Sequence, residues 1–99
     1  MKSVLLLGAA ITFALAGNPA SADTLQTVKD RGFLLCGVST GNPGFSAPND
    51  KGDWKGFDVD LCHAIAAAVF GDGSKVKYVP LTSKVRFTAL SSGEVDVLA

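Results

Sequence analysis

The chain contains few of the residues on which enzyme and metal chemistry depend. Its 99 residues include one histidine, His63, and two cysteines that are not arranged as Cys-x-x-Cys. These residues give little support to a metal site, and no Ser/His/Asp arrangement can be argued from one histidine. The stretch 39–42 has neither a Walker nor a dinucleotide-binding spacing, so it is weak evidence for a phosphate site. The sequence therefore predicts a protein that is not an enzyme and holds no cofactor or metal.

Basic clusters are also absent. Nine Lys and Arg residues balance nine Asp and Glu residues, and the aromatic residues are not interleaved with the basic ones. Nucleic acid is therefore not an expected partner. Residues 1–22 contain one lysine and no acidic residue, so residues 23–99 hold eight basic and nine acidic residues, a net charge of −1. No long apolar run follows residue 22, and the segment 23–99 is expected to be soluble.

Residues 1–22 have the three-part pattern of a secretory signal peptide. A short positive start precedes the uncharged apolar run 3–17. Small residues at 20–22 occupy the positions that a signal peptidase reads, which predicts cleavage after Ala22. The alternative is a membrane-spanning helix, but a span needs roughly 20 apolar residues and this run is shorter. The pattern predicts an exported protein.

The segment 23–99 alternates between helix-like and strand-like stretches. Apolar runs such as 33–38 suit strands that are covered on both faces, as in parallel sheets. The expected elements are a helix at 23–31, a strand at 33–38, a loop at 39–56, a helix at 58–70, a strand at 76–80, a helix from 82 or 83 to 90 and a strand at 95–98. The order β-α-β-α-β predicts an α/β fold with a parallel sheet and right-handed crossovers.

The helix expected at 58–70 has the clearest terminal signals. Asp58 is the expected N-cap, and Asp60 adds negative charge near the positive end of the helix dipole. Capping explains these aspartates better than an acid/base pair does, because residues two apart on a helix do not face each other. Phe57 is expected to pack on Cys62 as a hydrophobic staple, and Gly71 suits the C-cap.

Two apolar helix faces are expected to cover the sheet. In the first helix after the loop, the face consists of Leu61, Ile65 and Ala68. In the next helix, which Thr82 or Ser83 caps and Gly93 ends, it consists of Val85, Phe87 and Leu90. Residues 94–99 have the pattern of a buried strand, and a natural domain rarely ends on an unpaired apolar strand. The chain is therefore expected to be a truncated precursor.

The loop at 39–56 leaves the carboxyl end of the first expected strand. Open parallel sheets bind ligands beyond the carboxyl ends of their strands, and loops of this length are usually functional or disordered. Phe45 and Trp54 are embedded in this otherwise polar loop. An aromatic side chain there either contacts a ligand or only fills the space beneath the loop. The residues alone predict an exported α/β domain that binds a small molecule.

One stretch carries a resemblance to a known family. The run GFDVDL at 56–61, followed by Ile65-Ala66 and Val69, resembles the signature of the polar-amino-acid family of bacterial solute-binding proteins. The stretches GFLLCGVSTGNPGFS, GDWKGFDVDLC, AIAAAVFGD, KYVPLT, RFTAL and SGEVDVLA are similar to its general L-amino-acid-binding subgroup. The resemblance covers essentially all of residues 23–99.

The resemblance implies a protein with two α/β lobes that close on one free L-amino acid about a hinge. The closed form docks on the inner-membrane permease of an ABC importer, and the protein acts in the periplasm as a monomer. Residues 23–99 correspond to the first part of lobe one of this periplasmic-binding-protein fold. The family's carboxylate-anchoring arginine and the acidic residue of lobe two lie beyond Ala99, so this segment alone is not expected to bind well.

The resemblance also implies ligand contacts in the loop, namely Ser39, Asn42, Phe45 and Trp54. At Asn42 many relatives carry a stacking aromatic residue. Arg86 is expected in mid-helix on the surface rather than as a carboxylate anchor. His63 is expected on the solvent face of its helix.

The cysteines, Cys36 and Cys62, are expected to be either a disulfide or two buried free thiols. Oxidising compartments favour disulfides, and a bridge that closes about 27 residues contributes about 3 kcal/mol. Bridged Cα atoms must lie roughly 4.4–6.8 Å apart, a condition that packed elements often fail. The resembling subgroup tends to carry both cysteines, and this favours the disulfide.

Two other functions stay open beside amino-acid binding. Some family relatives are periplasmic dehydratases and others precede a peptidoglycan-cleaving domain, so an enzyme on the same fold is one alternative. The ligand-sensing domain of a membrane receptor is the other. Fold alone does not decide among them.

Overall fold

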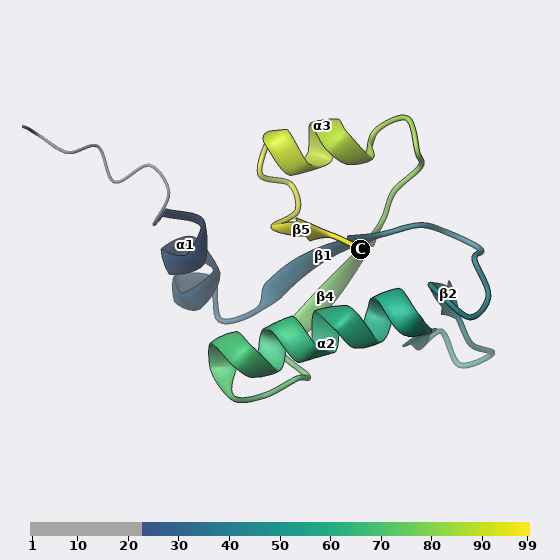
Figure 1. Cartoon of the computed structure of the whole chain (residues 1–99), viewed down its shortest axis with the longest axis horizontal. Helices are drawn as coiled ribbons and strands as arrows, with labels where there is room; N and C mark the ends of the chain where they lie inside the picture. Colours follow the sequence, from purple (N-terminus) through teal and green to yellow (C-terminus); the bar gives the residue numbers. More distant parts are fainter. Residues whose placement is uncertain (1–22) are drawn as a thin grey trace, which may run out of the picture.

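A computed structural model describes residues 23–99, and the expected signal peptide and its cleavage site after Ala22 lie outside the described residues. The elements, in chain order, are α1 (Asp23–Arg31), β1 (Leu34–Val38), β2 (Ala47–Pro48), β3 (Trp54–Lys55), α2 (Phe57–Phe70), β4 (Val76–Pro80), α3 (Arg86–Ser91) and β5 (Val97–Leu98). The expected β-α-β-α-β order is confirmed by β1, α2, β4, α3 and β5 (Figure 1). Within this part of the chain, no helix is long and apolar enough to cross a membrane.

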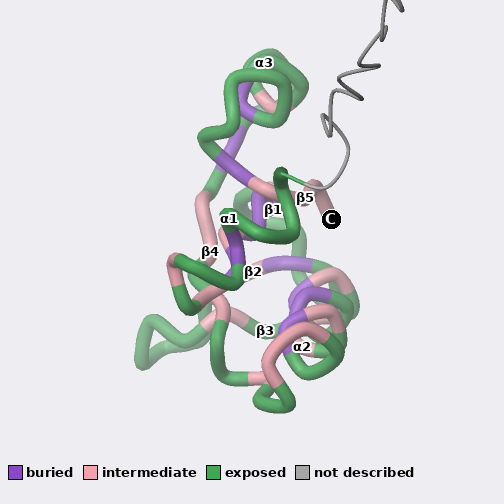
Figure 2. Tube along the Cα trace, turned by 90° about the vertical axis from the view of Figure 1, so that its left-hand side faces the viewer, coloured by how far each residue is buried: buried purple, intermediate pink, exposed green. Residues whose placement is uncertain are grey.

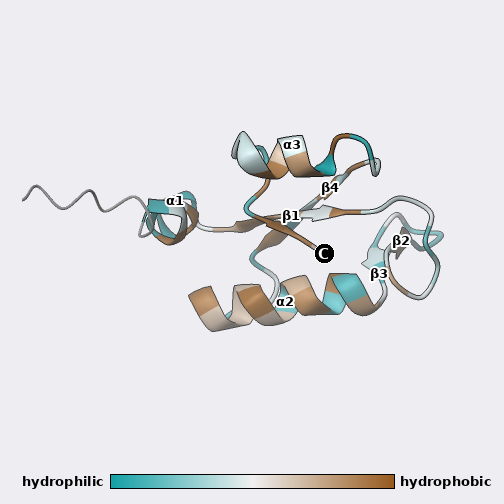
Figure 3. Cartoon of the chain, turned by 45° about the horizontal axis from the view of Figure 1, so that its top comes forward, coloured by the Kyte–Doolittle hydropathy of each residue, from teal (hydrophilic) through white to brown (hydrophobic). Residues whose placement is uncertain are grey.

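β1 is the central strand of a parallel sheet with the order β4-β1-β5. It pairs with all five residues of β4 and with both residues of β5. α2 lies on one face of this sheet and α3 on the other (Figure 3). Four of the five residues of β1 are buried, which confirms the strand covered on both faces that the apolar run predicts.

The core has two parts, one on each face of the sheet (Figure 2). The larger part joins α1, β1 and α2 through the buried residues Val28, Leu34, Cys36, Val38 and Cys62. The smaller part lies beside α3 and contains Leu81, Ala89 and Val95. A Cβ added to Gly37 would lie 2.8 Å from side-chain atoms of Leu81 and Leu98. The missing side chain at Gly37 therefore lets this smaller cluster approach β1.

The start of α2 differs from the prediction. Its N-cap is Gly56, at φ 129°, and no side chain makes a capping hydrogen bond, so the expected cap by Asp58 is wrong. Main-chain carbonyls of the preceding loop accept these N–H groups instead. Gly44 O accepts from Phe57 N–H and Phe45 O accepts from Asp58 N–H, both at 3.0 Å. Glycine is required at position 56, because a Cβ there would overlap the Phe45 carbonyl.

The buried face of α2 also differs from the prediction. The expected face of Leu61, Ile65 and Ala68 is wrong at Leu61 and Ala68, which are exposed, whereas Ile65 is half-buried and packs against the larger core cluster. The buried positions are Val59, Cys62 and Ala66. Phe57 is 69% exposed, so the expected staple between Phe57 and Cys62 is wrong as well. At the other end of α2, Gly71 is the expected C-cap, in the left-handed conformation with its N–H on Ala67 O at 2.8 Å.

α3 is shorter than predicted and begins at Arg86. The carbonyl of Thr82 accepts from the N–H groups of Val85 and Arg86, both at 3.2 Å, so a turn occupies the expected first turn of the helix. Neither Thr82 nor Ser83 is the cap, since the N-cap is Val85. The expected face of Val85, Phe87 and Leu90 is wrong, because all three are exposed. The late start leaves Ala89 as the residue of α3 that packs in the smaller cluster.

An ion pair joins the elements at the amino end of the sheet. Arg31 Nη1 lies 2.6 Å from Asp96 Oδ2, and Arg31 Nη2 lies 3.3 Å from Asp96 Oδ1. Asp96 Oδ2 also accepts from the N–H of Leu35 at 2.8 Å. The Asp96 side chain is only 6% exposed. One carboxylate thus connects the end of α1, the start of β1 and the residue before β5.

Candidate functional site

The carboxyl ends of β1, β4 and β5 meet at one edge of the sheet, which we call the carboxyl edge. From β1 the chain passes through α2 to β4, on one side of β1 in the sheet. From β4 it returns through α3 to β5, on the other side of β1. The strand order therefore reverses between β1 and β5. In open α/β sheets, ligands bind in the crevice at such a reversal. Ser39 directly follows β1 and Ala99 directly follows β5. These two residues therefore flank the position at which the fold favours a ligand.

The loop at 39–56 is more regular than predicted. β2 and β3 pair in antiparallel fashion within it. Asn42 O accepts from the N–H groups of Phe45 and Ser46, at 3.0 and 2.8 Å, which closes a turn. Ser46 is fully buried, and its hydroxyl donates to Ser39 O at 2.8 Å. These bonds hold the first part of the loop against the end of β1.

Arg86 lies at the same edge, so the expectation of a surface residue in mid-helix is wrong. It is the first residue of α3 and is half-buried. Its Nη1 donates to Ser39 Oγ at 3.4 Å, and its Nη2 donates to the main-chain oxygen of Ala99 at 3.2 Å. The guanidinium therefore connects the ends of β1 and β5 across the reversal of strand order.

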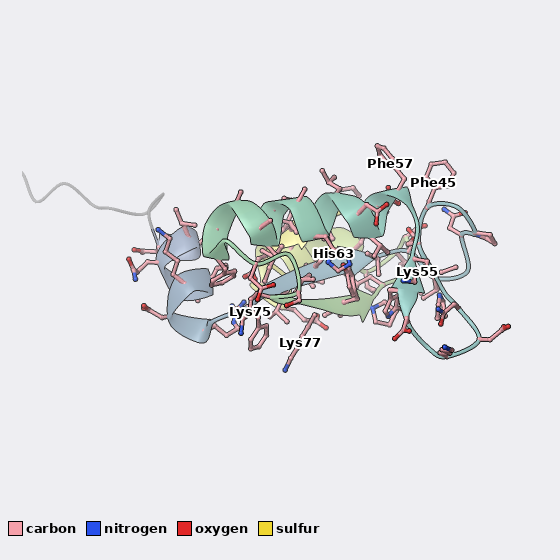
Figure 4. All side chains as sticks on the ribbon, turned by 90° about the horizontal axis from the view of Figure 1, so that it is seen from below. Phe45, Lys55, Phe57, His63, Lys75 and Lys77 are labelled. Atoms are coloured by element: carbon pink, nitrogen blue, oxygen red, sulfur yellow. A yellow bond between two sulfur atoms is a disulfide. The ribbon has the colours of Figure 1, made fainter. Side chains whose placement is uncertain are left out.

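The four expected ligand contacts do not lie together. Ser39, Asn42 and Phe45 belong to the hydrogen-bonded turn after β1. The Asn42 side chain is exposed, and Phe45 is 53% exposed. Figure 4 shows Phe45 beside Phe57, with both rings directed away from the sheet. Of this group, Ser39 alone hydrogen-bonds Arg86, so it is the member with direct access to a charged group.

Trp54 packs against the sheet. Its ring centroid lies 6.2 Å from that of Tyr78, and Tyr78 meets His63 edge-on at 5.8 Å. A hollow of about 350 Å³ is lined by Gly52, Asp53, Trp54, Lys55, His63 and Tyr78. Trp54 also packs against the larger core cluster. This is the arrangement of a residue that fills the space beneath the loop, and a ligand contact by Trp54 stays a prediction.

His63 and Tyr78 have structural hydrogen bonds. His63 is half-buried with its Nδ1 2.7 Å from Gly73 O, so the expected solvent-facing position is wrong. His63 is half-buried because the face of α2 that is turned to the sheet contains Val59, Cys62 and Ala66, and this is not the predicted face. The Tyr78 hydroxyl donates to Val59 O at 3.1 Å. Burial, with a smaller contribution from the charge of Asp60, raises the pKa of Tyr78 to about 12. Tyr78 is therefore neutral at physiological pH.

Cys36 and Cys62 form a disulfide, which is the pairing that the resemblance favours. Their Cα atoms lie 6.3 Å apart, and the bridge connects the middle of β1 to α2. Among residues 23–99, no group of three or more His, Cys, Asp or Glu side chains is placed to hold a metal ion. The carboxyl edge carries the donors of the Arg86 guanidinium beside hydroxyl and main-chain oxygens, and a guanidinium suits the binding of an oxygen-bearing ligand.

A parallel sheet between two helices, with its ordered loop at the carboxyl edge, is the architecture of part of one lobe of a periplasmic binding protein. Residues 34–99 match the bacterial extracellular solute-binding proteins, family 3, and the chain belongs to this family.

Two curated relatives match along the chain. The general L-amino acid-binding periplasmic protein AapJ of Rhizobium johnstonii is 57% identical over 102 residues, covering 100% of this chain and 30% of its own. The glutamate/glutamine/aspartate/asparagine-binding protein BztA of Rhodobacter capsulatus is 56% identical over 98 residues, covering 99% of this chain and 29% of its own. The chain therefore spans about 30% of the length of these relatives.

Solved structures show the same fold. A periplasmic binding protein of an ABC transporter from Brucella ovis, with glutathione bound, is 67% identical with a TM-score of 0.74, covering 76% of this chain and 23% of that protein. An ancestral cyclohexadienyl dehydratase is 28% identical with a TM-score of 0.63, covering 72% of this chain and 28% of that protein. The names of the curated relatives indicate solute-binding proteins, and this one neighbour indicates an enzyme.

Sequence reasoning misses Ser46 and gives Arg86 the wrong position. A serine that is buried within a polar loop has no distinguishing sequence pattern. Arg86 has no such signal either, because the sequence predicts a helix that begins at 82 or 83, and only the structure shows that α3 begins at Arg86.

Proposed function

We propose that this chain is the start of a longer protein that binds free L-amino acids in the periplasm and delivers them to an ABC permease in the inner membrane. We call this protein, at the length of its relatives, the extended protein. The observation that supports the proposal most strongly is the similarity to two amino-acid-binding periplasmic proteins along the chain. By analogy with them, its specificity is broad and includes acidic and amide amino acids.

In the extended protein, residues 1–22 act as a signal peptide that is cleaved after Ala22, and residues 23–99 form the first part of lobe one. A second lobe closes on the ligand about a hinge, in the manner of two-domain binding proteins. The protein works as a monomer. The proposed contacts from this segment are Ser39, Asn42, Phe45 and Trp54.

Calorimetric titration of the purified extended protein with each common L-amino acid tests this proposal. Several of them should bind, and ligand at 100 times its Kd should stabilise the fold by about 2.7 kcal/mol. Acetate and ammonium at the same concentrations serve as controls, since each carries only one of the charged groups of an amino acid. Absence of binding by every amino acid would contradict the proposal. N-terminal sequencing of the periplasmic protein should begin at Asp23.

An enzyme is the second candidate, because one structural neighbour is an ancestral dehydratase. The same titrations separate the two. A binding protein returns its ligand unchanged after release, and chromatography of the released ligand would reveal conversion by an enzyme.

A further inference from the structure

Three apolar side chains form an exposed patch where the loop at 39–56 meets α2. Phe57 is 69% exposed, Phe45 is 53% exposed and Leu61 is 47% exposed. Figure 4 shows the rings of Phe45 and Phe57 beside each other, and Leu61 follows Phe57 by four residues on the same side of α2. We call these three residues the outer patch. Single exposed apolar side chains are ordinary, but a contiguous group of them marks an interaction surface.

The backbone beneath the outer patch is fixed by main-chain hydrogen bonds. Gly44 O accepts from Phe57 N–H and Phe45 O accepts from Asp58 N–H, both at 3.0 Å. The two phenylalanine rings are therefore presented at a fixed spacing before any partner arrives, which lowers the entropy cost of binding. Aromatic side chains are also enriched in the buried cores of protein interfaces. The outer patch thus has the composition and the rigidity of an interface core.

The direction of the outer patch indicates a partner that is a separate molecule. Both phenylalanine rings are directed away from the sheet. α2 and α3 are the outer layers on the two faces of the sheet. Further strands and helices of lobe one would extend these layers sideways and leave the outer side of α2 at the surface. A second lobe that closes on a ligand beyond the carboxyl ends of the strands would not lie above α2 either.

Carboxylates border the outer patch. Asp60, which is exposed, follows Phe57 by three residues, and Asp58, which is half-buried, precedes Leu61 by three. Residues three apart are neighbours on the surface of a helix. The ion pair of the described residues lies at the amino end of the sheet, so neither carboxylate is paired within residues 23–99. A partner with an apolar pocket bordered by Lys or Arg would therefore be complementary to the patch.

We propose that the outer patch binds the periplasmic surface of the ABC permease, at an apolar pocket that basic residues border. This inference rests on the proposed function, in which the extended protein is a monomer that delivers amino acids to a permease. Phe45 belongs to the turn that also contains Asn42, and both are proposed ligand contacts. A permease bound at the outer patch therefore contacts the same segment that contacts the amino acid.

The test measures ATP hydrolysis by the ABC importer, reconstituted in lipid vesicles, as the concentration of extended protein saturated with L-glutamate is raised. Phe57→Ser should raise the concentration that gives half-maximal stimulation about tenfold or more, because an interface core loses an aromatic side chain. Its affinity for glutamate, measured by calorimetry, should stay within about twofold of wild type. Phe87→Ser is the matched control, since Phe87 is 72% exposed but belongs to α3, on the opposite face of the sheet. It should change neither quantity.

Asp60→Asn is the second variant, and it keeps the test valid if Phe57→Ser does not fold. It should raise the half-maximal concentration about threefold at low ionic strength, and this difference from wild type should disappear in about 0.5 M salt, which screens exposed charges. Glu94→Gln removes an exposed carboxylate from the loop before β5 and should leave the half-maximal concentration unchanged.

Equal stimulation by Phe57→Ser and wild type would overturn the inference and leave the proposed function standing. Loss of glutamate binding by folded Phe57→Ser would assign the outer patch to the second lobe instead. Self-association of the wild type that Phe57→Ser abolishes, measured by sedimentation, would assign it to a second copy of the protein. Either of these results would also overturn the inference. Wild-type protein that binds glutamate but does not stimulate the importer would refute delivery to the permease and the inference together.

Discussion

The two ends of the parallel sheet each contain an arginine, and the two arginines are used differently. At the amino end, Arg31 pairs with the nearly buried carboxylate of Asp96, which also accepts from the N–H of Leu35. At the carboxyl end, Arg86 donates to the Ser39 hydroxyl, and no side-chain carboxylate of residues 23–99 pairs with it. The amino end satisfies its charges within the fold, and the carboxyl end keeps donors available. The paired charge at the amino end therefore contributes to stability, whereas the donors of Arg86 engage only the hydroxyl of Ser39 and a main-chain oxygen among residues 23–99.

The largest expected effect comes from breaking the amino end. Arg31→Ala should lower the free energy of unfolding of the extended protein by about 3 kcal/mol, because it leaves the Asp96 carboxylate buried without a counter-charge. Urea unfolding followed by circular dichroism measures this change. The affinity for glutamate should stay within about twofold of wild type, since fully folded protein keeps its carboxyl edge.

Lys29→Ala is the matched control for Arg31→Ala, because Lys29 is an exposed cation on the same helix. It should change the free energy of unfolding by less than about 0.5 kcal/mol. If Arg31→Ala weakened glutamate affinity by much more than about twofold in folded protein, the distinction between the two ends would be lost.

A smaller effect on stability, together with an effect on binding, is expected at the carboxyl end. Ser46→Ala should destabilise the extended protein by about 1–2 kcal/mol, because the half-buried carbonyl of Ser39 loses the donor that the buried Ser46 hydroxyl provides. It should also weaken amino-acid binding, since Ser39 is then less firmly positioned. Ser91→Ala removes an exposed hydroxyl bond and should change neither quantity. Equal stability and binding for Ser46→Ala and wild type would show that Ser46 does not hold the loop.

The smallest effect is expected between the two ends, at Tyr78. Tyr78→Phe removes the hydrogen bond to Val59 O and should cost about 1 kcal/mol at neutral pH. Because the folded-state pKa is raised to about 12, the neutral hydroxyl stabilises the fold below the unfolded value of about 10, and this contribution is lost as the pH rises through 12.

The free energies of unfolding of wild type and Tyr78→Phe are measured from pH 8 to about 12. Because both proteins contain the same lysines, the difference between the two free energies isolates the titration of Tyr78. The difference should shrink above about pH 10. A difference that stays constant with pH would show that the Tyr78 pKa is not raised in the folded state.

The sequence predicts the order of the helices and strands better than it predicts which helix faces are buried and which groups cap the helices. Residues 23–31 and 76–80 are predicted with their observed bounds, because hydrophobic periodicity and flanking glycines or polar residues are local signals. The disulfide between Cys36 and Cys62 follows from the resemblance. The carboxyl-edge loop is predicted from the same order, since parallel topology decides which loops share an edge.

The helix faces and caps are not predictable in this way, because they depend on tertiary contacts. Nothing near Asp58 in the sequence shows that the carbonyl of Phe45, thirteen positions earlier, meets its N–H. The disulfide to Cys36 orients Cys62 toward the sheet, and the residue pattern within α2 does not contain this information. The role of Arg86 depends on Ser39, which is 47 residues away in the chain.

The junction between the loop and α2 is made by main-chain atoms. Gly44 O and Phe45 O receive the first N–H groups of the helix, and Gly56 provides the room for them to approach. The side chain of Phe45 takes no part in these bonds and is exposed. The side chain of Phe45 can therefore be exchanged in evolution or in the laboratory while the helix start is retained. New ligand preferences can then arise by changes of side chain on an unchanged backbone.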